Sequence, residues 1–241
     1  MRSGWAVQSF GYHRYLPLGR PEILAENLDR WGVDEIVVQC IDRSKQKLGP
    51  DIDVLSKVAK KNLGTPLIYA GGVSSLNEAV SVINSGADRL MVDAILHDDP
   101  KVMIEVSGRL GAQALIACLP VAYVEGTLLW YDYRSRESKP ISREVRDLLE
   151  EKVISELMLV DWNSEGKPNG FNLELIRRST LRNCSVITFG GLSSSEKMID
   201  VFANSVVKAA AIGNFLSYKE HALEEIKKNL DPNLIRISRA G

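Results

Sequence analysis

The chain has 241 residues, which is long enough for one α/β barrel or for two smaller domains with a sizeable core. Its composition, with 45% hydrophobic and 25% charged residues, is ordinary for a soluble globular protein. The formal net charge of -1 provides no broad basic field, which argues against nucleic acid as a partner.

Short β-rich segments alternate with amphipathic helical segments along the chain, eight of each. Segments such as Ile36-Val37-Val38 are continuously apolar, as is typical of strands covered on both faces in a parallel sheet. This alternation predicts a single α/β domain over residues 1–241, a (β/α)8 TIM barrel. The predicted strands span 5–9, 35–40, 66–70, 89–93, 112–118, 156–160, 185–189 and 206–212. The predicted helices span 21–31, 51–62, 75–85, 100–110, 142–152, 172–181, 194–203 and 218–229.

One segment, 121–138, interrupts the alternation. Glu125-Gly126 separates two apolar runs there, which is typical of a β-hairpin. We therefore expect a hairpin in the loop between the fifth strand and the fifth helix.

The stretches 69–75 and 188–194 are two copies of one pattern. Each carries a glycine pair, Gly71-Gly72 or Gly190-Gly191, after an apolar run and before a helical segment. About 17 residues later each copy continues into another apolar strand. Because the offset is near half the chain length, we expect two similar half-barrels, about 1–111 and 112–241.

These glycine pairs have two interpretations. Without a Cβ, the backbone approaches a ligand closely, and the unpaired N–H groups of a following helix attract an anion such as phosphate. The alternative is a tight strand-to-helix turn without a ligand. Because the pattern occurs twice at matching places, the two interpretations are about equally well supported.

Six segments together carry a family resemblance along nearly the whole chain. They are Gly32-Val33-Asp34-Glu35-Ile36-Val37, Ala70-Gly71-Gly72-Val73, Gly86-Ala87-Asp88-Arg89-Leu90, Gly111-Ala112-Gln113-Ala114-Leu115, Ser164-Glu165-Gly166-Lys167-Pro168-Asn169-Gly170-Phe171 and Phe189-Gly190-Gly191-Leu192. They resemble the family of the cyclase subunit of imidazole glycerol phosphate synthase, a HisF-like barrel. The resemblance implies a glutaminase subunit docked as a heterodimer on the N-terminal face of the barrel. It also implies that ammonia passes through the core to a bisphosphorylated substrate at the C-terminal face.

The resemblance fails at the two catalytic aspartates of the family. Phe10 occupies the matching position at the end of the first strand, and Pro120 occupies the one at the end of the fifth. Neither side chain can move a proton, which general acid–base catalysis requires. Only about ten residues separate Phe10 from the helix expected at Pro21, so the phosphate-gripping loop of the family is also shortened. These departures argue against the histidine-pathway cyclisation.

The positions that match the family's substrate contacts also differ. Glu165-Gly166 replaces an Asp-Gly pair, and Asp93 replaces an Asn. An acidic side chain near a phosphate site disfavours a bound dianion. The substrate-binding or phosphate-binding residues that we predict are Gly71, Gly72, Asp93, Gly166, Gly190, Gly191, Gly213 and Asn214.

By contrast, charged residues persist at the positions that match the entrance of the family's ammonia channel. Glu35, Arg89 and Glu156 match that entrance at the starts of the second, fourth and sixth strands, while Gly4, with Arg2 nearby, replaces an Arg at the first. The alternative is a solvated barrel rim. We predict that Glu35, Arg89 and Glu156 surround the channel entrance.

Two carboxylates after the sixth strand are the candidate acid–base residues. Asp161 directly follows a buried strand, so desolvation would raise its pKa, and Glu165 lies in the same loop. The alternative for Asp161 is to cap the loop. His13 lies in the short first loop, where it either grips a ligand or is simply exposed. We expect His97 and His221 to be structural.

The remaining patterns predict absences. Cys40, Cys118 and Cys184 have no regular spacing, and no His-x-x-x-His or Cys-x-x-Cys pattern is present, so we expect no disulfide framework, no metal site and no cofactor. No signal-peptide core follows Met1, and no window approaches the roughly 20 apolar residues of a membrane span. We expect a cytoplasmic protein without a membrane partner.

Three hypotheses for function follow. The first is a subunit that channels ammonia from a glutaminase to a phosphorylated or nucleotide-linked sugar, which resembles proteins associated with acetamidino or amide sugars of surface polysaccharides. The second is a cyclase of histidine biosynthesis, a lyase with substituted acid–base groups. The third is a phosphate-ligand-binding barrel without chemistry.

Overall fold

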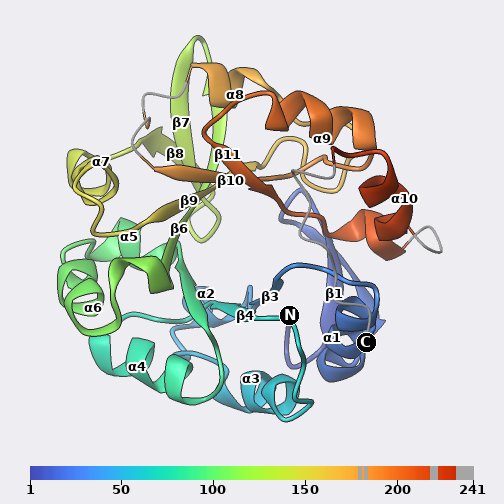
Figure 1. Cartoon of the computed structure of the whole chain (residues 1–241). Helices are drawn as coiled ribbons and strands as arrows, with labels where there is room; N and C mark the ends of the chain where they lie inside the picture. The colour runs from blue at the N-terminus through green and yellow to red at the C-terminus, as the bar shows by residue number, and fades with distance from the viewer. Residues whose placement is uncertain (179–180, 182–183, 218–221, 232–241) are drawn as a thin grey trace.

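The structure, a computed structural model, describes residues 1–178, 181, 184–217 and 222–231. It is an α/β barrel in which helices form an outer ring around the strands (Figure 1). The strands of the barrel are β1 (Ala6–Phe10), β3 (Ile36–Gln39), β4 (Leu67–Ala70), β5 (Arg89–Val92), β6 (Leu115–Val124), β9 (Glu156–Asp161), β10 (Ser185–Phe189) and β11 (Val207–Ala210). All of them except β1 belong to one nine-stranded sheet, in the order β11-β10-β9-β6-β5-β4-β3, and neighbours in this order run parallel. These are the eight strands that the sequence predicts, so the (β/α)8 fold class is confirmed.

The first strand differs from the prediction in its pairing. In the described ladders, β1 pairs antiparallel with β2 (Arg14–Gly19), a strand that lies where the sequence predicts only a short loop. Phe10 pairs with Arg14 across a tight turn, so the segment after β1 is a hairpin. Because β2 is largely exposed, its polar and apolar residues do not alternate clearly. Its sequence therefore does not predict a strand.

The predicted hairpin after the fifth strand is confirmed. β6 continues beyond the barrel to Val124 and pairs antiparallel with β7 (Thr127–Asp132), so that the turn falls at Glu125-Gly126. A further strand, β8 (Glu137–Pro140), pairs with β7. Trp130 of β7 is 1% exposed, so this three-stranded extension packs onto the body of the barrel.

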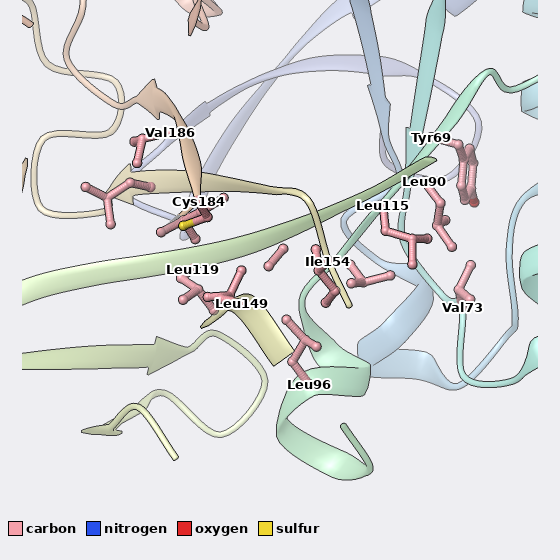
Figure 2. Packing of buried hydrophobic residues seen from close by; sticks show 14 of the residues in the cluster. Tyr69, Val73, Leu90, Leu96, Leu115, Leu119, Leu149, Ile154, Cys184 and Val186 are labelled. Carbon is pink, nitrogen blue, oxygen red and sulfur yellow. The ribbon is translucent and has the colours of Figure 1, made fainter. Parts of the chain in front are cut away.

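Residues of opposite parity along each strand enter two separate hydrophobic layers. In β4, Ile68 and Ala70 belong to the cluster inside the barrel, while Leu67 and Tyr69 pack under the helices. Figure 2 shows Tyr69, Leu90 and Leu115 in this outer layer. Because both faces of the strands are buried, their sequences are continuously apolar, as expected for a parallel barrel.

The helices begin at side-chain caps where the sequence predicts them. Asp51, Ser75, Ser142 and Ser194 each accept a hydrogen bond from the backbone N–H three residues later. The helices are α1 (Pro21–Arg30), α2 (Arg43–Gln46), α3 (Ile52–Ala59), α4 (Leu76–Asn84), α5 (Ala94–Asp98), α6 (Val102–Leu110), α7 (Arg143–Glu150), α8 (Glu174–Arg177), α9 (Ser195–Phe202) and α10 (Ala222–Lys228), with 3-10 turns η1 (Ala112–Ala114) and η2 (Asn214–Ser217). Positions 179–180 and 218–221 of the predicted helices, including His221, lie outside the described residues. None of the described helices combines the length and apolar character needed to cross a membrane.

The two glycine pairs adopt the same backbone in both halves of the chain. Gly71 and Gly190 have φ of +116° and +103°, and Gly72 and Gly191 have +79° and +74°. A Cβ on Gly71 would lie 2.2 Å from the carbonyl oxygen of Cys40, and one on Gly190 would lie 2.4 Å from that of Asp161. Each pair therefore packs against the end of the preceding strand in the sheet. The same packing occurs at the two matching positions of the half-barrel repeat.

A substitution at Gly72 tests this close packing. Its φ of +79° is strained for any other residue, and a Cβ there would lie 2.1 Å from the carbonyl oxygen of Gly49. Gly126 has an almost identical φ of +80° but nothing within 4 Å of the added Cβ. We expect Gly72→Ala to lower the free energy of unfolding by about 1–3 kcal/mol more than Gly126→Ala does, measured by urea denaturation. Equal losses would show that the neighbouring loop yields to the methyl group.

Candidate functional site

A cavity of about 690 Å³ reaches both ends of the barrel and also extends outward to α1 and α10, whose Leu28 and Ile226 line it. Its walls include Glu35 and Arg89 at the N-terminal end of the strands, Met91 and Cys118 in the interior, and Asp93 at the C-terminal end. Since residues from both ends line the same space, the interior is not completely filled by side chains. The cavity defines the candidate site.

The three charged residues predicted at the channel entrance lie together. The Nη2 of Arg89 is 2.8 Å from Oε2 of Glu156, and its Nη1 is 3.5 Å from Oε1 of Glu35. The Nε of Arg89 also donates a hydrogen bond to the carbonyl of Gln113. Arg89 is only 16% exposed, so this ion-pair cluster is partly shielded from solvent. All three residues line the N-terminal end of the cavity.

Arg2 does not take the place of the Arg that is missing at the start of the first strand. Arg2, which the sequence places near the missing entrance Arg, instead lies with its guanidinium 4.8 Å from the centre of the Tyr15 ring. The neighbouring Ser3 donates its backbone N–H to Asp42, at the C-terminal end of β3. Residues 1–3 therefore lie at the opposite end of the barrel from Arg89. Lys208 of β11, which the sequence analysis did not single out, lines the cavity.

The two candidate carboxylates after β9 have different environments. Asp161 is 2% exposed, and its two oxygens accept hydrogen bonds from the backbone N–H groups of Ser164 (3.3 Å) and Asn172 (2.8 Å). These bonds favour the loop-capping alternative, and Asp161 is not among the residues that line the cavity. Glu165 does line it, and burial raises the pKa of its carboxyl group, although the N–H of Tyr12 donates to Oε2 at 3.4 Å. Glu165 is therefore the better placed of the two for proton transfer.

The predicted substrate contacts divide into two groups. Gly71, Gly72, Asp93, Gly213 and Asn214 line the cavity at its C-terminal end. Gly166, Gly190 and Gly191 do not.

The two glycine pairs differ in their access to the cavity. The second pair is covered by a loop, and at the first pair one backbone N–H is already hydrogen-bonded within the protein. A Cβ on Gly191 would lie 2.9 Å from the backbone nitrogen of Phe171, because the loop after β9 covers this turn. At the first pair, the N–H of Gly72 donates to Oγ of Ser44 at 2.9 Å. One of the N–H groups predicted to bind an anion is thus already satisfied within the protein.

Charge is distributed unevenly along the cavity. Among the described residues, the basic side chains in its walls are Arg89, Lys208 and Lys227, all near the N-terminal end. The C-terminal end instead has the carboxyl groups of Asp93 and Glu165. A phosphate bound there would depend on backbone N–H groups and helix termini rather than on Lys or Arg.

Aromatic rings from three segments gather at this C-terminal end: the turn after β1, the region around the end of β7 and the loop after β9. Tyr131 stacks on Trp162 with ring centres 4.3 Å apart, and Tyr12 meets Tyr131 edge-on at 6.0 Å. Tyr133 lies 6.4 Å from Tyr12, and both line the cavity. Sequence analysis did not identify this cluster, although Tyr131 and Tyr133, two residues apart in the hairpin segment, were a signal for it. Flat rings of this kind suit an apolar or sugar ring face.

Asp93 has the most strongly shifted carboxyl group of the site. Burial, followed by the nearby carboxylate of Asp132, raises the pKa of Asp93 to about 8. Its side chain is 15% exposed, and the Nε2 of His97 lies 3.5 Å from Oδ1. Burial lowers the pKa of His97 to about 4, so this imidazole is neutral at physiological pH. No group of three or more metal-ligating side chains is found in the described part of the chain.

Comparisons with known proteins agree on one family. The family model described as "Histidine biosynthesis protein" matches residues 4–222. The imidazole glycerol phosphate synthase subunit HisF of Halalkalibacterium halodurans is 29% identical over 95% of this chain and 92% of its own. The HisF subunits of Bacillus licheniformis and Geobacillus thermodenitrificans are each 28% identical, over 95% of this chain and 92% of theirs.

The pH dependence of stability tests the burial of Asp93. Between its unfolded value near pH 4 and its folded pKa of about 8, the folded state holds a proton that the unfolded state has lost, so raising the pH across this window destabilises the wild type. Asp93→Asn removes this effect. We expect the variant to gain on the wild type by on the order of 1 kcal/mol for each pH unit within the window, measured by urea unfolding. Asp200→Asn, which changes an exposed residue of α9, is the control. The prediction would be contradicted if, for both variants, the difference in free energy of unfolding from the wild type did not change with pH.

Proposed function

Because the chain belongs to the histidine biosynthesis protein family, as a HisF-like synthase subunit, we propose that it pairs with a glutaminase and passes ammonia through its barrel to a sugar substrate. The substrate in this proposal is a phosphorylated or nucleotide-linked sugar of surface-polysaccharide biosynthesis, which receives the nitrogen as an acetamidino or amide group. The glutaminase docks on the N-terminal face as the second subunit of a heterodimer.

The observation that carries the proposal is the continuity of the cavity. The ion-pair cluster of Glu35, Arg89 and Glu156 lies at one end, and Asp93 and Glu165 lie at the other. Ammonia is small and neutral, so a route lined mostly by apolar side chains such as Met91 does not hold it by charge. A charged cluster at the N-terminal end is where a partner subunit would deliver it.

The residues at the two lost aspartate positions favour a different substrate from that of the histidine pathway. The side chain of Phe10 packs against Gly166, where an added Cβ would lie 2.8 Å from the ring. Pro120 lies within β6, beside Val160 of β9. Neither position supplies a titratable group, whereas ammonia delivery needs only an open route.

The C-terminal end of the cavity supports a sugar rather than a free bisphosphate. In the described part of the chain its walls carry Tyr12, Tyr133, Asp93 and Glu165 but no Lys or Arg. Aromatic rings pack on the apolar face of a sugar, and carboxyl groups accept hydrogen bonds from hydroxyl groups. A single phosphate or a nucleotide-linked phosphate would be held by backbone N–H groups near Gly71.

A second candidate function is the cyclase reaction itself, as a lyase of histidine biosynthesis. It is favoured by the names of the relatives, which are imidazole glycerol phosphate synthase subunits. In this reading Glu165 and Asp161 would replace the lost acid–base pair. The hydrogen bonds of Asp161 to the backbone of Ser164 and Asn172 argue against that role.

Mixing the purified chain with its glutaminase tests the ammonia route. We expect the rate of glutamine hydrolysis to rise by roughly tenfold, in the range of typical coupling between protein sites. Arg89→Met should lose most of this stimulation, because Glu35 and Glu156 are left without their shared cation.

The matched control is Arg143→Met, which removes an Arg whose side chain is 91% exposed. It should keep the full stimulation, because Arg143 lies in α7, away from the entrance. An unchanged hydrolysis rate with the wild-type chain would contradict the pairing with a glutaminase. Equal effects of the two Arg variants would contradict the role of the entrance cluster.

A turnover assay distinguishes the two candidate functions. The chain is incubated with the bisphosphorylated histidine-pathway substrate and ammonium, and imidazole product is measured. We expect turnover to be lower by several orders of magnitude than in a HisF subunit that keeps both aspartates, since Phe10 and Pro120 cannot transfer protons. Turnover within about tenfold of such a subunit would favour the cyclase instead.

A further inference from the structure

A buried Asp–His contact links the barrel cavity to a second cavity outside the ring of strands. Asp93, which precedes α5, lines the barrel cavity. His97, one helical turn later, lines a separate cavity of about 280 Å³ beside Trp130 and Lys139. The Nε2 of His97 lies 3.5 Å from Oδ1 of Asp93. The two side chains therefore span the wall between the cavities.

Three of the four polar side-chain atoms of this pair form no hydrogen bond within the described residues, and Trp130 is the indole donor that acts on the Asp93 carboxyl. Oδ1 of Asp93 and both ring nitrogens of His97 are buried, and none has a hydrogen-bond partner among the described residues. The His97 side chain is 2% exposed and stacks on Trp130, with ring centres 3.4 Å apart. Leaving buried polar groups unpaired costs about 1–3 kcal/mol each, so a purely structural role would favour an apolar pair here.

The proton count of the pair follows from its surroundings. Burial raises the pKa of Asp93 to about 8 and lowers that of His97 to about 4. Both side chains are therefore neutral at physiological pH, so the pair holds one carboxyl proton and one imidazole proton. Two bare lone pairs facing each other at this distance would repel.

Charges near the pair are largely compensated. Arg134 donates to both oxygens of Asp98 and to Asp132, so the guanidinium is neutralised by two carboxylates. Lys139 of β8 also faces His97 from the outer side. The titratable groups around Asp93 and His97 are Asp98, Asp132, Arg134 and Lys139 on the outer side and Tyr12, Cys118 and Tyr133 on the barrel side.

We propose that Asp93 is the group that gives and takes a proton at the C-terminal end of the barrel cavity, and that His97 is the positioning residue that shares this proton. When a ligand takes the proton from Oδ1, Asp93 becomes a carboxylate and the ligand keeps the proton. The imidazole then changes tautomer by exchange with water of the outer cavity, which His97 lines: Nδ1 releases one proton and Nε2 takes one. Nε2 now donates a hydrogen bond to Oδ1, and the pair carries one negative charge. The identity of the ligand rests on the proposed function, whereas the proton-sharing pair does not.

Nitrogen NMR of the full chain with ¹⁵N-labelled histidine, and carbon NMR with ¹³C-labelled aspartate carboxyls, tests the pair without any substrate. With Asp93 protonated, Nε2 of His97 accepts the hydrogen bond; once Asp93 ionises, Nε2 must donate. We expect a tautomer switch of His97 at the ionisation midpoint of Asp93, near pH 8. His13→Gln assigns one of the three histidine signals.

Three variants separate proton sharing from packing. Asp93→Asn should abolish the tautomer switch. His97→Phe keeps a ring to stack on Trp130 but has no N–H to donate to the carboxylate, so the midpoint of Asp93 should rise by about one pH unit or more, roughly a tenfold change in proton affinity. His97→Gln restores an N–H donor and should return the midpoint toward that of the wild type.

Several results would overturn the proposal. These are a single His97 tautomer across the whole pH range, an Asp93 midpoint in the ordinary acidic range, or a tautomer switch that survives Asp93→Asn. The wild-type titration alone decides the first two, even if a variant fails to fold. The NMR titration contains neither glutaminase nor sugar. A negative glutaminase assay therefore does not bear on the proton-sharing pair, and a negative titration does not bear on the pairing with a glutaminase.

Discussion

The close approach of backbone to backbone at the two glycine pairs determines how the C-terminal end of the barrel is built. Gly71 lies against the carbonyl of Cys40, and Gly190 against that of Asp161, at distances that no side chain tolerates. Each contact holds a strand-to-helix turn against the end of the neighbouring strand. The loops that follow β3 and β9 are therefore fixed in position, and they determine which side chains surround the cavity.

Sequence predicted what depends on periodicity and on local turn chemistry. The eight barrel strands, the hairpin at Glu125-Gly126 and the Ser75 and Ser194 caps all follow from local patterns, and the structure has them. The grouping of Glu35, Arg89 and Glu156 was also predictable, because the starts of parallel strands meet at one end of a barrel.

The remaining features depend on contacts between segments far apart in the chain. No local pattern tells that Trp130, carried by the hairpin, covers His97, or that the loop after β9 uses both oxygens of Asp161. His97 was predicted to be structural because it lies at a helix start, and Asp93 to contact substrate because it follows a strand. Their shared environment required tertiary packing that a sequence pattern does not contain.

The hairpin connects the two unusual features of the C-terminal end. Arg134, in the turn after β7, binds Asp98 of α5 and Asp132, and so ties the hairpin to the helix that carries His97. The same hairpin carries Tyr131, which stacks on Trp162 near the mouth of the cavity. By covering Asp93 and His97 with Trp130, the hairpin helps to place a neutral carboxyl group in the wall of the barrel cavity, directly after β5.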